Sequence, residues 1–303
     1  MLAALPFLAG FDFKNETFDD ELKTAVSNRG IALIADIQTG LLTGCSAMQR
    51  AIKGYPIGSL AKIITATALL EEKIIHKDHK YYCKGFDIRG NRKINCWNPN
   101  GHGIMTLETA IKESCNLYFL NQARKIAPCD LLKYYYTFKL DRPELKSEST
   151  IPPANFLPPN GLTEQLALGT DRNLLLTPAN ILNLSCTIAR NGIYIPLWRT
   201  TPPATEEIIT VSSHTMKAIQ SGMKGAASTG TAKLLNEKGF RAAAKTGTAP
   251  IKAEKTCGWC TGYLPYDNPR LAFCVFVNEG TGFSDAVPLA VKVLNICKQK
   301  NLF

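Results

Sequence analysis

A serine and a lysine three positions apart, Ser59 and Lys62, are the residues of this chain best placed to do covalent chemistry. A serine hydroxyl is a weak nucleophile at neutral pH, and a lysine amine can deprotonate it only where burial or a neighbouring cation lowers the lysine pKa. Two further elements follow along the chain, first Ser114-Cys115-Asn116 and then Lys245-Thr246-Gly247. In this order the three elements predict a serine acyl-transfer site, with Ser59 as nucleophile, Lys62 as its base and Lys245 as the neighbouring cation.

The order of the elements carries more weight than any one of them. A Ser-x-x-Lys match is expected about once by chance in a chain of this length, and this chain has a second match, Ser221 to Lys224. The second match follows the Ser-x-Asn element and lies only a short run before Lys245, so we assign the nucleophile to Ser59. An isolated match would be interpreted as a helix-capping serine with a solvated lysine one turn later.

The residues around Ser59 predict how the nucleophile is placed. Gly58 permits a tight turn, and the stretch from Leu60 to Lys73 contains neither Gly nor Pro, so we predict a helix that begins at Ser59. Free backbone amides and the positive end of the helix dipole stabilise negative charge that develops in the first turn. The spacing of three residues brings Lys62 to the same face of the helix as Ser59.

Ser114 and Asn116 lie in a segment, Leu107 to Ala123, whose apolar pattern predicts a helix that is broken at the Ser-Cys-Asn triplet. A hydroxyl and an amide would then project into a cleft. A polar kink that satisfies its own backbone is the alternative. Cys115, the middle residue, is interpreted as a small packing residue rather than a reactive thiol.

Lys245 to Thr248 follow three alanines, Ala242 to Ala244, and precede Pro250, which predicts a strand whose edge faces the cleft. Gly247 would let the backbone approach a ligand closely, and the strand edge could pair with a peptide-like substrate. A surface strand with threonine and lysine on its wet face is the alternative.

Longer stretches around these elements resemble successive segments of the transpeptidase module of class B penicillin-binding proteins. The stretches are YPIGSLAKIITATALLEE, GHGIMTLETAIKESCNLYFL, LALGTDRNLLLTPANILNLSCTIARNG, and AAAKTGTAP followed by WCTGYLPYDNPRLAFCVFV. The resemblance covers most of residues 29–300. The segments around Cys83 and Cys96, just before Gly101-His102-Gly103, are most similar to the elongation-type members.

The resemblance implies a peptidoglycan D,D-transpeptidase. Ser59 would attack the penultimate D-Ala carbonyl of a stem pentapeptide, release the terminal D-Ala and pass the acyl group to an amine on a neighbouring strand, and β-lactams would acylate the same serine. Ser114 would relay a proton between Lys62 and the leaving group, and Asn116 would hold the substrate amide. No cofactor and no catalytic metal are predicted.

The strand element completes this expected site. Lys245 would supply charge, and Thr246 and Thr248 would offer hydroxyls to a terminal carboxylate. The backbone amides of Ser59 and Thr248 are the expected oxyanion hole. Pro56-Ile57-Gly58 stands where Pro-Gly is more usual in the family, which bears on substrate preference more than on chemistry because no reacting group is altered.

Other functions remain as alternatives. A D,D-carboxypeptidase shares the first half-reaction and uses water as acceptor. A β-lactamase needs a means of activating water, and the chain has no Glu in the class A context, while Asn116 departs from the class D pattern. A non-catalytic penicillin-sensing module is the alternative of a different class, because the family's usual anchor and pedestal are not seen in this sequence.

Composition sets further expectations about partners. The chain has 303 residues, a net charge of +10 and 45% hydrophobic residues. This charge would suit phosphate-bearing lipids or wall polymers, but the charges are scattered and no nucleic-acid-binding signature appears. The resemblance implies peptidoglycan stem peptides and β-lactams as ligands, a membrane glycosyltransferase or cell-elongation complex as partner, and the periplasmic or extracytoplasmic face of the inner membrane as location.

Ten cysteines are many for a cytosolic enzyme. Most lie in apolar stretches and are interpreted as core residues, as are the two of Cys257-Gly258-Trp259-Cys260, which fall in a predicted strand. Cys83 and Cys96 flank a polar loop, where a disulfide is the preferred interpretation for an exported protein. A zinc site that draws on a nearby histidine is the alternative; the candidate histidines are His76, His79 and His102.

The apolar pattern predicts an α/β (α+β) fold of the β-lactamase/transpeptidase-like kind, with the site at the junction of two lobes. Nearly continuous apolar runs at 31–37 and 271–277 predict strands of an antiparallel sheet built from both chain ends. A closing helix is expected at 285–299. We therefore divide the chain into a leader or truncated export segment at 1–20 and a transpeptidase domain at 21–303, with a sheet subdomain (21–62 and 236–303) and an inserted all-helical subdomain (63–235).

Overall fold

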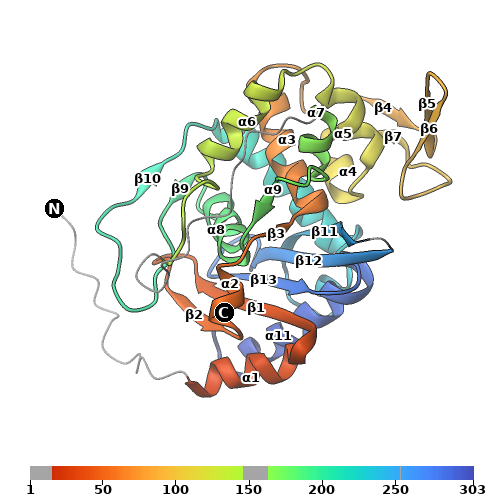
Figure 1. Ribbon diagram of the computed structural model, residues 1–303. Coiled ribbons are helices and arrows are strands. Elements are labelled where there is room, and N and C mark those ends of the chain that lie inside the picture. Colours follow the sequence, from red (N-terminus) through yellow and green to blue (C-terminus); the bar gives the residue numbers. More distant parts are fainter. Residues whose placement is uncertain (1–15, 146–162, 253) are drawn as a thin grey trace.

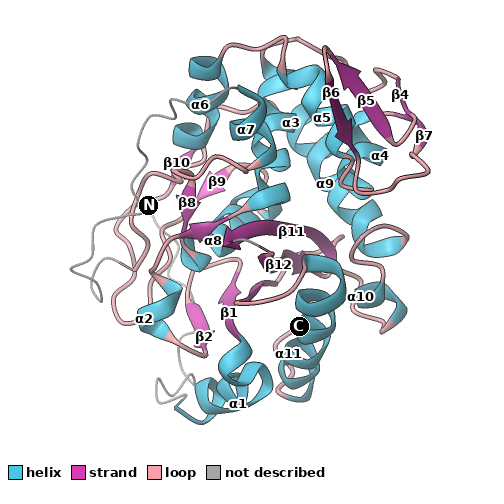
Figure 2. Cartoon of the chain, turned by 45° about the vertical axis from the view of Figure 1, so that its right-hand side comes forward, coloured by secondary structure: helices cyan, strands magenta, loops and turns pink. Residues whose placement is uncertain are grey.

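Apolar strands from both ends of the chain form the central sheet (Figures 1 and 2). The computed structural model describes residues 16–145, 163–252 and 254–303. All neighbouring strands of the sheet are antiparallel. Across the sheet the order is β11 (Ala243–Lys252), β12 (Lys255–Leu264), β13 (Leu271–Val277), β1 (Gly30–Asp36) and β2 (Leu42–Cys45). The predicted fold class is confirmed, and β11 lies at an edge of the sheet.

The side chains of β1 alternate between two apolar cores. Ile31 and Leu33 belong to the core under the helical lobe, whereas Ala32 and Ile34 belong to the core on the other face. Successive side chains of a strand point to opposite faces, so a strand covered on both sides must be apolar throughout. This explains the continuous apolar run that predicted the strand.

Helices cover both faces of the sheet. On one face lie α1 (Glu16–Val26) and α11 (Val287–Gln299), which run side by side below the sheet in Figure 1. On the other face lies α8 (Pro178–Ala189), whose residues are all buried. The predicted closing helix is confirmed, and it follows a π-helical turn, Gly282–Ala286.

The inserted lobe is built mainly of helices. Its larger helices are α3 (Ala61–Glu71), α4 (Leu107–Lys112), α5 (Asn116–Ala123), α6 (Pro128–Thr137), α7 (Thr163–Leu168) and α9 (Ser213–Ser228). The short elements of the chain are α2 (Met48–Ala51), β3 (Tyr55–Pro56), a 3-10 turn at Gly58–Leu60, β8 (Leu175–Leu176), β9 (Ile193–Tyr194), β10 (Glu207–Ile208) and α10 (Leu234–Glu237).

The lobe is not all-helical, and this part of the prediction is wrong. Four short strands form two antiparallel ribbons that project from the lobe in Figures 1 and 2. They are β4 (Tyr81–Cys83), β5 (Phe86–Arg89), β6 (Arg92–Asn95) and β7 (Gly103–Met105). Strands of three or four residues are too short for an alternating pattern to be recognised in the sequence.

Parts of the predicted division fall on residues that the structure does not describe. Residues 1–15 of the expected leader and residues 146–162 of the inserted subdomain lie outside the described residues. Residues 16–20 form the first turns of α1, where Phe18 is buried. Among the described residues, we find no helix with the length and apolar character needed to cross a bilayer.

Candidate active site

The predicted nucleophile, Ser59, lies in a turn built around Gly58. Ser59 is the central residue of the 3-10 turn, and α3 continues directly from that turn, so the α-helix begins two residues later than predicted. Gly58 has a φ of +52°, and a Cβ on it would lie 2.1 Å from the carbonyl oxygen of Thr248. Its amide donates to the carbonyl of Gly169 at 3.1 Å. The turn is therefore fixed against β11 on one side and the helical lobe on the other.

Lys62 is completely buried, and its side-chain nitrogen contacts Ser59 and both polar residues of the Ser-Cys-Asn triplet. Nζ lies 2.9 Å from Oγ of Ser59, 2.7 Å from the backbone oxygen of Ser114 and 2.6 Å from Oδ1 of Asn116. Oγ of Ser114 is 3.3 Å away. Three residues from two segments that are remote in the sequence thus meet around the Lys62 nitrogen.

Lys245 reaches the same group from β11. Its Nζ donates to Oγ of Ser114 and to the backbone oxygen of Thr246, each at 2.8 Å. The Ser114 hydroxyl therefore bridges the two lysines. A continuous chain of hydrogen bonds runs from Lys245 through Ser114 and Lys62 to the hydroxyl of Ser59.

The two lysines are both buried, and burial controls their protonation. Burial lowers the pKa of Lys62 to about 8. Burial and, after it, the positive charge of Lys62 hold the pKa of Lys245 well below its usual range. Two cations in a dry site repel each other, so the pair titrates as a unit and one lysine loses its proton far more readily than an exposed lysine does.

The backbone at the Ser-Cys-Asn triplet directs its side chains to opposite sides. Ser114 has a φ of +53°, α4 ends before it, and α5 begins at Asn116, so the predicted break is confirmed. Cys115 caps α5, and its Sγ accepts the amide of Tyr118 at 3.4 Å. Ser114 and Asn116 face Lys62, whereas Cys115 faces the thiol of Cys96 at 3.8 Å.

The edge strand β11 is held close to the nucleophile turn. A Cβ on Gly247 would lie 2.8 Å from the carbonyl oxygen of Ile57, so the close backbone approach at this glycine is made by the nucleophile loop itself. On the same strand, the hydroxyl oxygen of Thr248 accepts the amide of Gly282 at 2.9 Å. Both contacts fix the strand edge next to Ser59.

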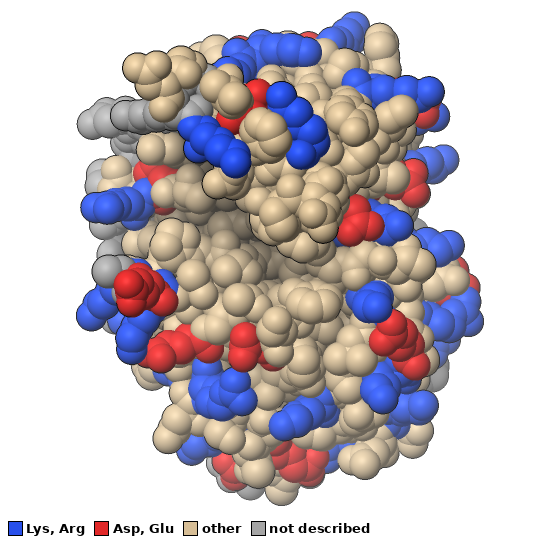
Figure 3. Space-filling view, turned by 90° about the vertical axis from the view of Figure 1, so that its right-hand side faces the viewer, with Lys and Arg blue, Asp and Glu red and all other residues tan. Residues whose placement is uncertain are grey.

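A cavity of about 860 Å³ lies between the far end of β11 and the loop that follows α7, and none of the predicted site residues lines it. Its lining residues are Pro56, Gly169, Thr170, Asp171, Arg172, Leu175, Pro250, Ile251, Lys252 and Glu254. Figure 3 views the molecule from the side of the projecting ribbons and shows a hollow below the upper lobe, with charges of both signs around it. An extended peptide could lie in such a groove along the strand edge.

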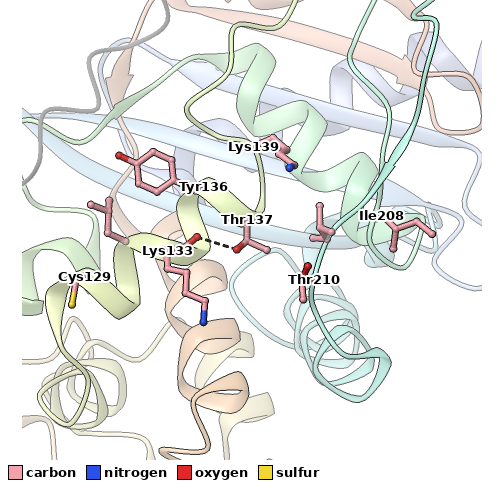
Figure 4. Close-up of a pocket in the computed structure, with 9 residues that line it drawn as sticks. Cys129, Lys133, Tyr136, Thr137, Lys139, Ile208 and Thr210 are labelled. Carbon is pink, nitrogen blue, oxygen red and sulfur yellow. Dashed lines mark hydrogen bonds between the residues drawn. The ribbon is translucent and has the colours of Figure 1, made fainter.

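A second hollow, of about 550 Å³, lies between α6 and β10 and contains none of the predicted site residues (Figure 4). Its two lysines are already paired, Lys133 with Glu72 at 3.0 Å and Lys139 with Glu207 at 3.0 Å. The Thr137 hydroxyl donates back to the carbonyl of Lys133. We assign no chemistry to this hollow.

Four side chains with metal-ligating atoms gather on the other side of the triplet. The ligand atoms of Cys83, Cys96, His102 and Cys115 all lie within 4.8 Å of one another. Nδ1 of His102 is 3.5 Å from Sγ of Cys83 and 3.6 Å from Sγ of Cys96. The hydrogen bond from Cys115 lowers the pKa of the Cys96 thiol, which favours a thiolate at this position.

The donor set and its spacing fit a tetrahedral zinc site. Zinc prefers thiolate and imidazole ligands, and with zinc–sulfur bonds of about 2.3 Å the sulfur atoms of a tetrahedron are about 3.8 Å apart. The Sγ atoms of Cys96 and Cys115 are separated by 3.8 Å. The four residues, Cys83, Cys96, His102 and Cys115, could therefore hold a zinc ion.

These contacts change the interpretation of the cysteines. Cys83 and Cys96 are free thiols in the structure rather than the expected disulfide. Of the three candidate histidines only His102 belongs to the cluster. Cys115 is buried, as predicted for a packing residue, but it also contacts a second thiol, and only its place inside the catalytic triplet could have signalled this. Cys257 and Cys260 are buried in β12, which confirms their packing role.

One further neighbour of the site was missed from the sequence. Thr231 follows α9, and its hydroxyl accepts the hydroxyl of Thr246 at 2.8 Å. The short Ser228-Thr229-Gly230-Thr231 run gives no signal of its own, because threonine and glycine are common in turns.

Comparison with known proteins identifies the class of domain to which this fold and site belong. Residues 30–295 match the family model described as the penicillin-binding protein transpeptidase domain. The chain therefore belongs to the family of penicillin-binding protein transpeptidase domains, which confirms the resemblance seen in the sequence.

Curated relatives are similar over part of their length. The chain is 27% identical over 200 residues to stage V sporulation protein D of Bacillus subtilis, which covers 59% of this chain and 30% of the relative. It is 28% identical over 294 residues to peptidoglycan D,D-transpeptidase MrdA of Haemophilus influenzae, which covers 81% of this chain and 45% of the relative. The chain spans less than half the length of either protein.

A solved structure of a related protein has the same fold. Penicillin-binding protein PBP2 of Helicobacter pylori, solved in complex with MreC, matches with a TM-score of 0.81 at 20% identity, over 95% of this chain and 63% of that chain. At this level of identity the likeness concerns the fold, and function must be argued from the site.

Proposed function

We propose that this protein is a serine D,D-transpeptidase of peptidoglycan synthesis, in which Ser59 forms an acyl-enzyme with D-Ala-D-Ala stem peptides and with β-lactams. One observation carries the proposal: the buried Lys62 nitrogen lies 2.9 Å from Oγ of Ser59 while two carbonyl oxygens occupy its other sides.

The two carbonyl contacts orient the amine of Lys62 so that its lone pair can act as a general base. A neutral amine has two N–H donors and one lone pair. The backbone oxygen of Ser114 and Oδ1 of Asn116 can only accept, so they take the two donors. The lone pair is then left for the hydroxyl proton of Ser59. The lowered pKa of Lys62, about 8, makes this neutral form accessible near neutral pH.

The rest of the hydrogen-bond chain accounts for the proton after attack. As Ser59 Oγ bonds to the carbonyl carbon, its proton passes to Lys62. The Ser114 hydroxyl, 3.3 Å from Lys62 and 2.8 Å from Lys245, can accept a proton from either lysine while it donates its own to the amine of the leaving D-Ala. The positive charge left on the lysine pair stabilises the oxyanion and the substrate carboxylate.

The β11 edge supplies the remaining binding groups of the proposal. The substrate backbone would pair along this edge. Lys245 and the hydroxyls of Thr246 and Thr248 would face its terminal carboxylate, with Gly247 keeping the edge close to Ser59. The amides of Ser59 and Thr248 would bind the oxyanion, as expected from the sequence.

Proposals about acceptor, partner and location rest on the relatives. The name of the Haemophilus influenzae relative is that of a peptidoglycan D,D-transpeptidase, which favours an amine acceptor over the water used by a carboxypeptidase or β-lactamase. The Helicobacter pylori structure holds MreC, and a cell-elongation complex that includes a membrane glycosyltransferase is the corresponding partner here. Such a role places the protein at the extracytoplasmic face of the inner membrane.

In this proposal the cluster of Cys83, Cys96, His102 and Cys115 stabilises the structure around the catalytic triplet and takes no part in the reaction. A zinc ion held by the four ligands would fix Cys115, and with it the positions of Ser114 and Asn116 in the catalytic triplet. When bound, zinc supplies a cross-link between the projecting ribbons and α5 rather than a reacting group.

Intact-protein mass after incubation with benzylpenicillin tests the acyl-serine. Wild type should gain one stable adduct, Ser59→Ala none, and Ser221→Ala, from the second Ser-x-x-Lys match, the same adduct as wild type. An adduct on Ser59→Ala would overturn the assignment, and an adduct that turns over rapidly with drug hydrolysis would indicate a β-lactamase. Release of D-Ala from a pentapeptide, with and without an added amine acceptor, then separates transpeptidation from hydrolysis.

A further inference from the structure

The nucleophile loop, residues 55–58, leads directly to Ser59 and is held from two sides. Pro56 pairs with β8 on one side. Proline has no backbone N–H, so its carbonyl oxygen is its only polar group. That oxygen accepts the indole N–H of Trp259 at 2.8 Å, and the thiol of Cys257, a much weaker donor, lies 3.5 Å from it. The loop is therefore fixed to β12 mainly through one tryptophan.

Trp259 lies where the nucleophile loop meets β11. It is the cross-strand partner of Gly247, and cross-strand partners point to the same face of a sheet. A Cβ on Gly247 would lie 2.8 Å from the carbonyl oxygen of Ile57 and 3.3 Å from Cβ of Trp259. The glycine thus leaves the space in which the loop and the tryptophan come together, and Trp259 connects the loop to the sheet at this point.

The indole of Trp259 has a fixed position. The side chain is fully buried. Its ring packs against Phe276, with ring centroids 4.6 Å apart, and against Tyr55 of the nucleophile loop at 6.4 Å. The rings of Tyr55 and Phe276 also contact each other, at 4.3 Å. A closely packed ring cannot turn to follow a moving acceptor, so the indole N–H defines where the Pro56 carbonyl must lie.

All three tryptophans of the chain donate to a backbone carbonyl, but only Trp259 donates to the nucleophile loop. Trp97 donates to the carbonyl of Glu113, and Trp198 donates to that of Thr39, each at 2.9 Å. Thr39 lies in the turn between β1 and β2, so Trp198 makes the same kind of hydrogen bond without contacting the loop. It is a matched control for Trp259.

We propose that Trp259 is a positioning residue for acylation, whose indole N–H fixes the nucleophile loop and with it the place of Ser59 relative to β11. This inference rests on the proposed acyl-serine function. The indole contacts no reacting group and acts through the Pro56 carbonyl, three residues before Ser59. A displacement of a reacting atom by about 1 Å can slow a reaction about a hundredfold.

Two replacements at position 259 and one control test the role of the N–H. Trp259→Phe keeps an aromatic ring and removes the donor. Replacing Trp259 by 3-benzothienylalanine keeps the bicyclic shape and puts sulfur in the place of the N–H, so this variant decides the question if phenylalanine prevents folding. Trp198→Phe is the control. The concentration dependence of acylation by benzylpenicillin, measured by mass between pH 6 and 9, separates the dissociation constant of the first complex from the acylation rate constant.

Both replacements of Trp259 should lower the acylation rate constant between about tenfold and a hundredfold. The dissociation constant and the midpoint of the pH profile should stay at their wild-type values, because the uncharged indole contacts neither lysine. Trp198→Phe should acylate at the wild-type rate.

Three results would overturn the inference: a wild-type rate in the benzothienylalanine variant, an equal loss in Trp198→Phe, or a loss confined to the dissociation constant. A wild type that is never acylated would instead refute the proposed function, so the two failures are distinguishable.

Discussion

Two buried polar centres share the triplet Ser114-Cys115-Asn116, and they differ in how their charges are balanced. In the lysine centre, Lys62 and Lys245 find hydroxyl and carbonyl acceptors from the chain itself. In the cysteine centre, three thiols and one imidazole face one another within 4.8 Å. Both centres crowd like groups into a dry space, which is unfavourable unless a proton or an ion balances them.

Under the proposed function, this difference distinguishes a reacting centre from a structural one. Burial lowers the pKa values of both lysines, and the charge of Lys62 lowers that of Lys245 further, so one amine can be neutral and accept a proton near neutral pH. Repulsion among thiolates is relieved by protonation or by a bound cation, and the donor set of the second centre suits a metal ion that would also fix the loop. The strained φ of Ser114, +53°, lies between the two centres and is held by both.

Removing the base should have the largest effect. Lys62→Met keeps the length of the side chain and removes the amine, and we expect acylation by benzylpenicillin to slow by about a thousandfold. Folding should be retained, because methionine fills the same volume and its lack of charge removes the repulsion with Lys245, which offsets the loss of a donor to the Ser114 and Asn116 oxygens. Lys224→Met, in the second Ser-x-x-Lys match, is the exposed control and should acylate at the wild-type rate. A small loss in Lys62→Met, with folding intact by circular dichroism, would contradict the assignment of the base.

The pH dependence of acylation should follow the lysine pair. The base acts only when deprotonated, and the pKa of Lys62 is lowered to about 8. Below that pH the rate should therefore rise about tenfold per pH unit, and it should level off above it. Acylation rates from quenched time courses between pH 6 and 9 measure this dependence. A flat profile, or a rate that falls with rising pH, would show that the lysine pair does not control the chemistry.

Metal content and thermal stability test the cysteine centre. We expect about one zinc per chain by elemental analysis, and Cys83→Ser should lose it and lower the melting temperature by about 5–10 °C, as a loss of a few kcal/mol does in a domain of this size. Cys129→Ser, at an exposed cysteine, should change neither value. A metal-free wild type whose mass is two daltons low would show a disulfide between Cys83 and Cys96 instead.

The smallest expected effects come from replacing two glycines, whose costs in stability can be compared directly. Gly58 and Gly90 both have positive φ, +52° and +56°, but a Cβ would collide with Thr248 at the first and meet nothing within 4 Å at the second. Gly90→Ala should cost about 1–2 kcal/mol of unfolding free energy from backbone strain alone. Gly58→Ala should cost more and also slow acylation, because Ser59 must move. Urea unfolding measures both, and equal costs would contradict the close approach of β11.

The lysine centre could be predicted from the sequence because its chemistry is concentrated in short motifs. Ser59 and Lys62 are joined by one helical turn, and local geometry alone places them together. The strand with Lys245 was predicted from its flanking alanines and proline. The strands β1 and β13 were predicted because full burial on both faces demands a continuous apolar run.

Other contacts could be predicted only in part, because they depend on backbone geometry between distant segments. Residue types suggested a zinc site at Cys83 and Cys96, but only the ribbons β4–β7 select His102 from the three candidate histidines and bring in Cys115. The contact between Thr231 and Thr246 depends on how α9 ends against α4, and no residue type or spacing near it indicates the partner.

The sequence by itself determined the identity and order of the reacting groups, since Ser-x-x-Lys, Ser-x-Asn and Lys-Thr-Gly must each keep their residue types for the chemistry to work. Only the tertiary structure decided how those groups share protons and which side of the triplet each residue faces. The physical reason is that hydrogen bonds and pKa shifts depend on distances of about 3 Å and on burial, and both arise when segments remote in the chain pack together.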